Sequence, residues 1–204
     1  MHKQGSQEWL DARLGMLTGS RLARALAKTG KGWSDKRAGV MFELLAEQLT
    51  GKSADSYVSK DMQWGRDYEA DARRMYEVTT GNMVSECGLI EHPTIKGIGA
   101  SPDGLIVDDG LLEIKCPKTT THLQYIYAGV VPEAYTLQMD LQLLCTQRKW
   151  CDFDSYDPRM RLEDQMSFII RYEPSADHLK SVEDQCVVFL AELAALRQTI
   201  EAKQ

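Results

Sequence analysis

The spacing of apolar side chains predicts that helices form much of this chain. Between Asp61 and Thr80 they recur every three or four residues, which places them on one face of a long helix. A shorter helix is predicted over residues 6–14, where Trp9 and Arg13 share a face. With serine, proline or glycine at their boundaries, further helices are predicted over 20–28, over 38–50, from about 120, after Pro132, and from 175 to the end.

Alternation of apolar and polar positions predicts strands elsewhere, over residues 82–91, 95–100, 148–156 and 166–172. Between the second and third of these lies the turn signal Asp108-Asp109-Gly110, with a short apolar run on each side, which predicts a β-hairpin. Residues 29–37 and 52–60 are predicted as loops. Helices on both sides of these strands indicate an α/β fold, with a mixed sheet flanked by helices.

The hairpin carries three ionisable side chains that indicate a catalytic site. Glu113 and Lys115 lie two apart on its second strand and point to the same face, whereas Ile114 points to the other. Asp103 precedes the first strand, and the hairpin would fold it back beside Glu113. Two close carboxylates repel each other, and Mg²⁺ or Mn²⁺ would remove that penalty. Because a neighbouring lysine can orient water, the set is typical of metal-assisted phosphodiester hydrolysis.

The same residues also fit a structural role, in which a surface hairpin carries a Lys–Glu pair and Asp103 caps a turn. An aspartate followed ten residues later by Glu-x-Lys is a short pattern. The spacing alone therefore leaves the catalytic and the structural interpretation open.

Composition indicates an ordinary globular protein. The 204 residues are 43% hydrophobic and 26% charged, which suits one domain over residues 1–204. The five cysteines are an odd number without a CxxC pair, which predicts reduced thiols in the cytoplasm and argues against a zinc or iron–sulfur site. The chain has no apolar run long enough for a membrane span, and its start lacks the apolar stretch of a signal peptide.

The net charge of −6 is unusual for a protein that binds nucleic acid, which normally has a basic surface. A basic face toward DNA would reconcile the negative net charge with DNA binding, although the basic side chains could equally be ordinary solvated charges. The candidates are grouped near the start of the chain: Arg13, Arg21, Arg24, Lys28, Lys31, Lys36 and Arg37.

Four spaced motifs resemble one nuclease family. Asp103 with Glu113-Ile114-Lys115, preceded by Pro102, is similar to the PD-(D/E)xK nuclease signature. More specifically, SPDG followed by LEIKCP resembles the phage lambda exonuclease family, also called the YqaJ viral recombinase family. R-L-G-x-L-T-x-S from Arg13, W-G-x-x-x-E ending at Glu69, and Y-x-x-Q from Tyr135 resemble its other motifs. The resemblance implies a restriction-endonuclease-like fold.

The resemblance also implies roles for individual residues. Asp103, Glu113 and the Ile114 carbonyl would bind Mg²⁺, with two ions per site and Mn²⁺ as a substitute. Glu69 would support the second ion or its water, which the agreement of two motifs favours, although an ion pair with Arg73 would also explain its position. Lys115 would orient or activate the attacking water.

Further residues are implied as contacts to DNA, each with a plainer alternative. Arg13 and Ser20 would hold a 5′-phosphate, although Ser20 also suits a helix N-cap. The other implied contacts are Ser101, Tyr135, Gln138, Lys31 and Met62. Ser101 would otherwise cap a turn, and Tyr135 and Gln138 would simply lie on one helix face. Lys31 would otherwise be a loop residue, and Met62 would fill the core. In the functional interpretation, Met62 would be a wedge between the terminal bases.

For the whole protein, the resemblance implies a Mg²⁺-dependent exonuclease that degrades the 5′-ended strand of double-stranded DNA. It would release mononucleotides, prefer 5′-phosphate ends and leave 3′ single strands for a single-strand annealing protein. Ring-shaped homotrimers, and a phage or prophage origin with action in the bacterial cytoplasm, are implied in the same way. Two alternatives remain, namely a structure-specific endonuclease of the same superfamily and a DNA-end-binding subunit without catalysis.

Overall fold

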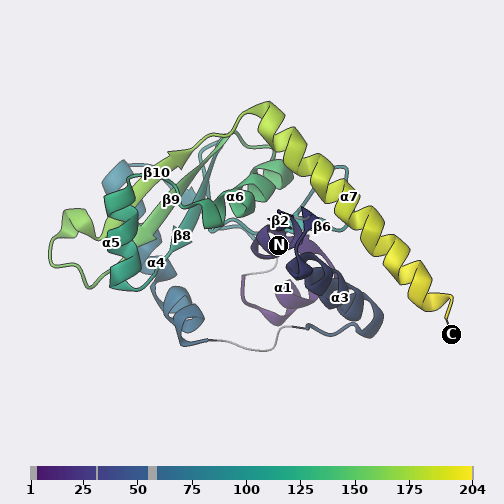
Figure 1. Ribbon diagram of the computed structural model, residues 1–204. Helices are drawn as coiled ribbons and strands as arrows, with labels where there is room; N and C mark the ends of the chain where they lie inside the picture. The colour runs from purple at the N-terminus through teal and green to yellow at the C-terminus, as the bar shows by residue number, and fades with distance from the viewer. Residues whose placement is uncertain (1–3, 31, 55–58, 204) are drawn as a thin grey trace.

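A five-stranded mixed sheet forms the centre of the computed structural model, which describes residues 4–30, 32–54 and 59–203 (Figure 1). The strand order is β10-β9-β8-β7-β4, and only β8 and β9 run parallel. The strands are β10 (Ser167–Tyr172), β9 (Trp150–Tyr156), β8 (Gly110–Lys115), β7 (Gly104–Ile106) and β4 (Val84–Ser85). The predicted hairpin is therefore β7 and β8, at the middle of the sheet.

Alternation along β8 sends its side chains into two different layers. Leu112 and Ile114 pack with Ala72 and Tyr76 of α4 (Lys60–Thr80) on one face. On the other face, Leu111 packs with residues of α6 (Glu133–Thr146). Since Glu113 and Lys115 share the face of Leu111, they point toward the α6 side, as the period of two predicts.

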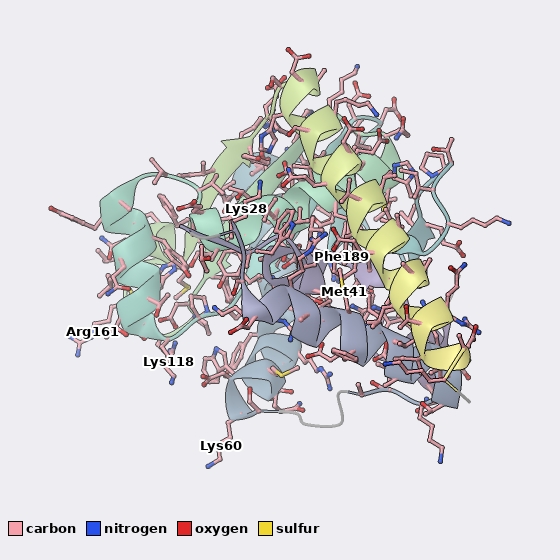
Figure 2. All side chains as sticks on the ribbon, turned by 45° about the vertical axis from the view of Figure 1, so that its right-hand side comes forward. Lys28, Met41, Lys60, Lys118, Arg161 and Phe189 are labelled. Atoms are coloured by element: carbon pink, nitrogen blue, oxygen red, sulfur yellow. The ribbon has the colours of Figure 1, made fainter. Side chains whose placement is uncertain are left out.

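A second layer is built on the three-stranded sheet β1-β6-β5, in which the strands are β1 (Leu17–Thr18), β6 (Ile98–Ala100) and β5 (Ile90–Glu91). Its core is shared with α2 (Gly19–Ala25), α3 (Asp35–Thr50) and α7 (Ala176–Glu201). Phe189 of α7 is fully buried there, and Met41 of α3 packs against the same core (Figure 2). The remaining helices are α1 (Gln7–Ala12) and α5 (Thr119–Ala128).

The predicted helices are present, but the one predicted over 20–28 is α2, which begins at Gly19 after Thr18 and ends at Ala25, so Ser20 is not its N-cap. Serine and glycine caps explain where several of the others begin and end. Ser6, Ser34, Ser59 and Ser175 each accept a backbone N–H at a helix start. The helices α3, α4 and α5 end at Gly51, Gly81 and Gly129, which have φ values of 64°, 74° and 65°. A side chain at such a φ would be strained, so glycine suits each stop.

Several predicted boundaries are wrong. Residues 29–37 are not one loop, because β2 (Lys28–Thr29) pairs with β3 (Gly32–Trp33) and α3 begins at Asp35. Of the predicted loop 52–60, residues 55–58 lie outside the described part of the chain and Lys60 already belongs to α4. The predicted turn between β9 and β10 contains a short 3₁₀ helix, η1 (Glu163–Gln165).

The two strands predicted before the hairpin are also shorter than expected. Residues 82–91 form two strands in different sheets, because β4 pairs with β7 whereas β5 pairs with β6. Residues 95–97 form no strand because the chain turns there. The ring nitrogen Nδ1 of His92 accepts the backbone N–H groups of Thr94 and Ile95, at 3.3 and 3.1 Å, and stabilises that turn.

The five cysteines Cys87, Cys116, Cys145, Cys151 and Cys186 carry free thiols. Within residues 4–30, 32–54 and 59–203, no helix combines the length and the apolar character that a membrane crossing needs.

Candidate active site

The hairpin brings Asp103 against β8. The backbone N–H of Asp103 donates to the Leu112 carbonyl at 3.1 Å, and the backbone N–H of Ile114 donates to Asp103 Oδ2 at 2.8 Å. These two hydrogen bonds fix the carboxylate beside the strand that carries Glu113 and Lys115. The second oxygen of Asp103 remains available to a ligand.

Glu113 is fully buried and its carboxylate accepts hydrogen bonds from three side chains. Lys115 Nζ donates to Oε1, and Gln138 Nε2 donates to the same oxygen at 2.6 Å. Gln142 Nε2 donates to Oε2 at 2.5 Å. Both glutamines come from α6 at a spacing of four, so they lie on one face of the helix. Such charge-assisted hydrogen bonds offset part of the cost of burying an ionised carboxylate.

Glu69 reaches the same region from α4. Its side chain is 33% exposed and forms the anticipated ion pair with Arg73, at 2.8 Å. Arg73 also pairs with Glu86 at 2.9 Å. Burial raises the pKa of Glu69, Arg73 opposes this, and the charge of Glu113 raises it further. The ion pair and a place near the other carboxylates therefore occur together rather than exclude each other.

A cavity of about 370 Å³ lies where α4 meets β8, and we call it the carboxylate cavity. Glu69, Asp103, Ile114 and Lys115 all line it. Its other lining residues are Asp61, Met62, Gly65, Arg66, Cys116, Pro117 and Tyr135. Four predicted site residues, one from α4 and three from the region of the hairpin, are thus gathered around one space.

The charges in this cavity favour a bound cation. Burial raises the pKa of Asp103 well above its ordinary value, and the charge of Glu113 raises it further, because two carboxylates share a poorly solvated site. For Lys115, desolvation lowers the pKa, but Glu113 and Asp103 outweigh it and the net shift is upward. The neighbouring carboxylates therefore favour the ammonium form of Lys115, which can donate hydrogen bonds.

The oxygen donors here fit Mg²⁺, which commonly takes one or two protein carboxylates and completes its shell with water and phosphate. Asp103 and Ile114 line the carboxylate cavity, whereas Glu113 lies behind it, fully buried, with its carboxylate bonded to Lys115, Gln138 and Gln142. The predicted set of Asp103, Glu113 and the Ile114 carbonyl would supply such donors. Among the described residues, no group of three or more His, Cys, Asp or Glu side chains is arranged as a metal site. The fit therefore rests on two carboxylates and a backbone carbonyl.

A second cavity of about 200 Å³ adjoins the first, and we call it the arginine cavity. Asp103 lines both cavities, which makes it the residue they share. Arg13, Ser20, Ser101 and Gln138, which were predicted to contact DNA, all line the arginine cavity. Its remaining lining residues are Gln4, Trp9, Thr18, Gly19, Ala100 and Gln142.

Arg13 is held in this cavity by Trp9 rather than by a carboxylate. The centre of its guanidinium lies 3.9 Å from the centre of the Trp9 ring. Its Nε is buried and has no hydrogen-bond partner in the described chain. Burial, together with the charge of Arg21, lowers the pKa of Arg13 to about 10, so it stays charged at neutral pH. A buried cation with an unused donor is a suitable partner for an anion.

Two residues that sequence reasoning left out of the site also belong to this cavity. Trp9 Nε1 donates to Ser101 Oγ at 3.0 Å, so Trp9 contacts two predicted DNA-binding residues. Gln142 contacts Glu113, as described above. The spacing of Trp9 and Arg13, and that of Gln138 and Gln142, place each pair on one helix face, but the sequence could not say which groups those faces meet.

The other residues predicted to contact DNA have individual surroundings. Tyr135 stacks on Phe153, with ring centres 5.5 Å apart, and Lys115 Nζ lies 5.1 Å from the centre of the Tyr135 ring. Met62 is 50% exposed at the carboxylate cavity, so it does not fill the core. Lys31 lies outside the described residues. Gln138 reaches the arginine cavity, but one of its amide hydrogens is already bonded to Glu113.

Most arginines near the start of the chain have structural partners. Arg21 pairs with Glu47 at 2.5 Å, and Arg24 pairs with Glu43 at 2.8 Å. Arg37 is buried and pairs with Glu192 at 2.9 Å. The charges of these three residues therefore stabilise contacts between helices, and a basic face toward DNA stays a prediction.

Comparison with known proteins places this fold among nucleases. The sequence profile of the YqaJ-like viral recombinase domain family matches residues 8–149. The structure resembles the crystal structure of an alkaline exonuclease from Laribacter hongkongensis, with a TM-score of 0.89, 42% identity and 97% of each chain covered. That enzyme has also been solved in complex with dAMP.

Two more distant matches extend the comparison. A phage-related exonuclease from Haemophilus somnus 129PT shares the fold, with a TM-score of 0.71 at 14% identity over 93% of this chain and 96% of that one. An uncharacterized protein of Acanthamoeba polyphaga mimivirus is 26% identical over 93% of this chain, which spans only 36% of that protein's length. By its fold and by the matched residues, this chain belongs to the YqaJ-like viral recombinase domain family.

Proposed function

We propose that this chain is a Mg²⁺-dependent exonuclease that degrades the 5′-ended strand of double-stranded DNA. The observation that carries the proposal is the position of Asp103 between the carboxylate cavity and the arginine cavity. A terminal phosphate held by Arg13 would place the next phosphodiester near the carboxylates. The 42% identity to an alkaline exonuclease over nearly the whole chain supports the same reaction.

Asp103, Glu113 and the Ile114 carbonyl would hold the metal, with Glu69 close enough to influence a second ion or its water. When bound, Mg²⁺ would supply Lewis-acid stabilisation of charge that develops on the phosphate oxygens. Mn²⁺ has the same preference for oxygen ligands and would substitute. A bound cation would also relieve the repulsion that raises the pKa of Asp103.

The other residues of the site would bind and orient. Lys115, which is protonated, would donate a hydrogen bond to the attacking water or to a phosphate oxygen. Arg13 would pair with the terminal 5′-phosphate, and the hydroxyls of Ser20 and Ser101 would donate to its oxygens. Binding the phosphate in a fixed place would set the cut at one nucleotide from the end.

Three further aspects, which the resemblance to this family led us to expect, belong to this proposal. Met62, which lines the carboxylate cavity and is 50% exposed, would separate the terminal base pair. A homotrimeric ring would keep the enzyme on its DNA. A single-strand annealing protein would take up the remaining 3′ strand, which fits a role in phage or prophage recombination in the bacterial cytoplasm.

The test uses one linear duplex with 5′-phosphate ends, the same duplex with 5′-hydroxyl ends, and a covalently closed circle, each with Mg²⁺ and with EDTA. We expect Mg²⁺-dependent loss of the linear duplexes, faster from 5′-phosphate, with mononucleotides and 3′ single strands as products. Asp103→Asn, which keeps the shape of the side chain, should abolish degradation. Cleavage of the circle would indicate a structure-specific endonuclease, and binding without degradation would indicate an end-binding subunit.

A further inference from the structure

Gln142 is a buried polar residue that the proposed reaction does not yet use. It lies on α6, one turn after Gln138, with 1% of its surface exposed. It lines the arginine cavity and also bonds to Glu113, so it lies between the end-binding residues and the catalytic carboxylate. Among the lining residues, only Gln138 shares this combination.

The hydrogen bond from Gln142 determines how Glu113 is held. Oε1 of Glu113 already has two donors, Lys115 and Gln138. Oε2 accepts from Gln142 Nε2 at 2.5 Å, and no other donor to that oxygen is present in the described chain. Because Glu113 is fully buried, water cannot readily replace this donor. Loss of the Gln142 amide would therefore leave one carboxylate oxygen free to rotate away.

The other end of the Gln142 amide is unsatisfied. An ionised carboxylate only accepts hydrogen bonds, so the NH₂ group must face Glu113 and Oε1 must face away from it. This Oε1 is buried and has no partner among the described residues. Arg13 Nε, on the same cavity, is a buried donor that also lacks a partner there. Unpaired buried polar atoms are rare, and a pair of them around one polar cavity indicates a ligand or an ordered water.

We propose that Gln142 is a positioning residue of the nuclease site, an inference that rests on the function proposed above. Its N–H group fixes the carboxylate of Glu113 in the orientation that the reaction requires. Its Oε1 accepts a hydrogen bond from water that accompanies the terminal phosphate in the arginine cavity. Gln142 thereby links an occupied end site to the geometry of Glu113, without contacting the reacting atoms.

The test compares the wild-type chain with Gln142→Met and Gln142→Leu. Methionine keeps an unbranched side chain of similar size but cannot donate or accept a strong hydrogen bond. Leucine is also apolar and lacks both the donor and the acceptor. Leu143→Met is the matched control, because Leu143 is the next buried residue on α6 and volume-conserving changes are well tolerated. Circular dichroism would establish that each variant folds.

On a linear duplex with 5′-phosphate ends, we expect Gln142→Met to lower kcat about 10- to 100-fold with KM changed less than about twofold. The affinity for Mn²⁺, measured by calorimetry without DNA, should fall about 10- to 100-fold as well. A purely structural role would lower the melting temperature without separating kcat from KM. If Gln142→Met does not fold, Gln142→Leu carries the same comparison, because leucine cannot donate to Glu113 either.

Wild-type kcat and Mn²⁺ affinity in folded Gln142 variants would overturn the inference and leave the proposed function intact. A rise in KM at constant kcat would also overturn it, because Gln142 would then bind DNA rather than position Glu113. A wild-type chain that degrades no DNA would overturn the proposed function, and this inference with it.

Discussion

The centre of the Arg13 guanidinium lies over the indole of Trp9, 3.9 Å from the centre of the ring. The indole N–H in turn donates to Ser101 Oγ at 3.0 Å. Trp9 thus connects two side chains that line one cavity but are far apart in sequence. A stacked guanidinium keeps its N–H donors in a fixed plane, which suits recognition of a phosphate.

Arg13→Ala should remove the preference for a 5′-phosphate. Loss of a charged hydrogen-bond partner of the phosphate is expected to weaken binding about 10- to 100-fold. The effect should appear as a higher KM on 5′-phosphorylated duplex, with little change on 5′-hydroxyl duplex. Steady-state kinetics on the two substrates measure this, and Arg24→Ala, which removes a surface ion pair with Glu43, is the control. Equal losses on both substrates would contradict an end-phosphate site.

Two substitutions at Trp9 should separate its contacts. Trp9→Phe keeps an aromatic ring beside Arg13 but removes the N–H that donates to Ser101, so we expect a loss of about threefold in kcat/KM on 5′-phosphate ends. Trp9→Ala removes both contacts and should approach the Arg13→Ala phenotype. If both variants keep wild-type kinetics on phosphorylated ends, then Trp9 only packs α1 against the domain.

Local pattern predicted the residues that the hairpin and α4 bring together. Period two along β8 placed Glu113 and Lys115 on one face, and the helical period of α4 placed its apolar face correctly. The turn signal also explains how Asp103 returns beside β8. These features depend on residues close in sequence, so the local sequence pattern is enough to predict them.

Features that depend on packing between distant elements were not predictable. The role of α6 in supplying both Gln138 and Gln142 to Glu113 requires the register of that helix against the sheet. The ion pairs that occupy Arg21, Arg24 and Arg37 likewise join separate helices. A period on one helix shows which residues share a face, but not what that face meets.

Asp154 should make the protein less stable as the pH rises. It is fully buried on β9, its Oδ1 has no partner in the described chain, and burial raises its pKa from 3.8 to about 7. A carboxyl with a raised pKa in the folded state stabilises it most below pH 3.8, and this contribution is lost as the pH passes 7. The maximum effect is about 4 kcal/mol. Urea denaturation at pH 5 and pH 8 measures it.

The variant Asp154→Asn should remove this dependence and be more stable than the wild type at pH 8, with a smaller difference at pH 5. Asp157→Asn is a control for which the opposite pH dependence is expected. Although burial raises its pKa, hydrogen bonds from Arg159 outweigh that and the net shift is downward. The stability from Asp157 is present above its ordinary pKa and lost in acid, so its variant should be destabilised at both pH values. An unchanged pH slope in Asp154→Asn would show that the carboxyl ionises freely.

Basic side chains around the carboxylate cavity should set the salt dependence of DNA binding. Lys60, Lys118 and Arg161 project from the same side of the molecule (Figure 2). Lys60 and Lys118 are next in sequence to the cavity residues Asp61 and Pro117, and Lys118 Nζ lies 3.3 Å from Asp61. Exposed ion pairs of this kind are weak, so a DNA phosphate can compete for Lys118.

Replacing all three by alanine should weaken binding to any duplex sequence, because phosphate contacts carry no sequence information. The slope of log K against log salt should become shallower by about 2 to 3, since each phosphate contact contributes about 0.9. Fluorescence anisotropy with a catalytically inactive Asp103→Asn background, at several salt concentrations, measures this slope. Alanine substitutions at Lys180 and Arg197 of α7 and at Lys203, just after it, remove equal charge, and α7 lies across the molecule from α4 and α5 (Figure 1). If these controls flatten the slope equally, net charge rather than a DNA path explains the effect.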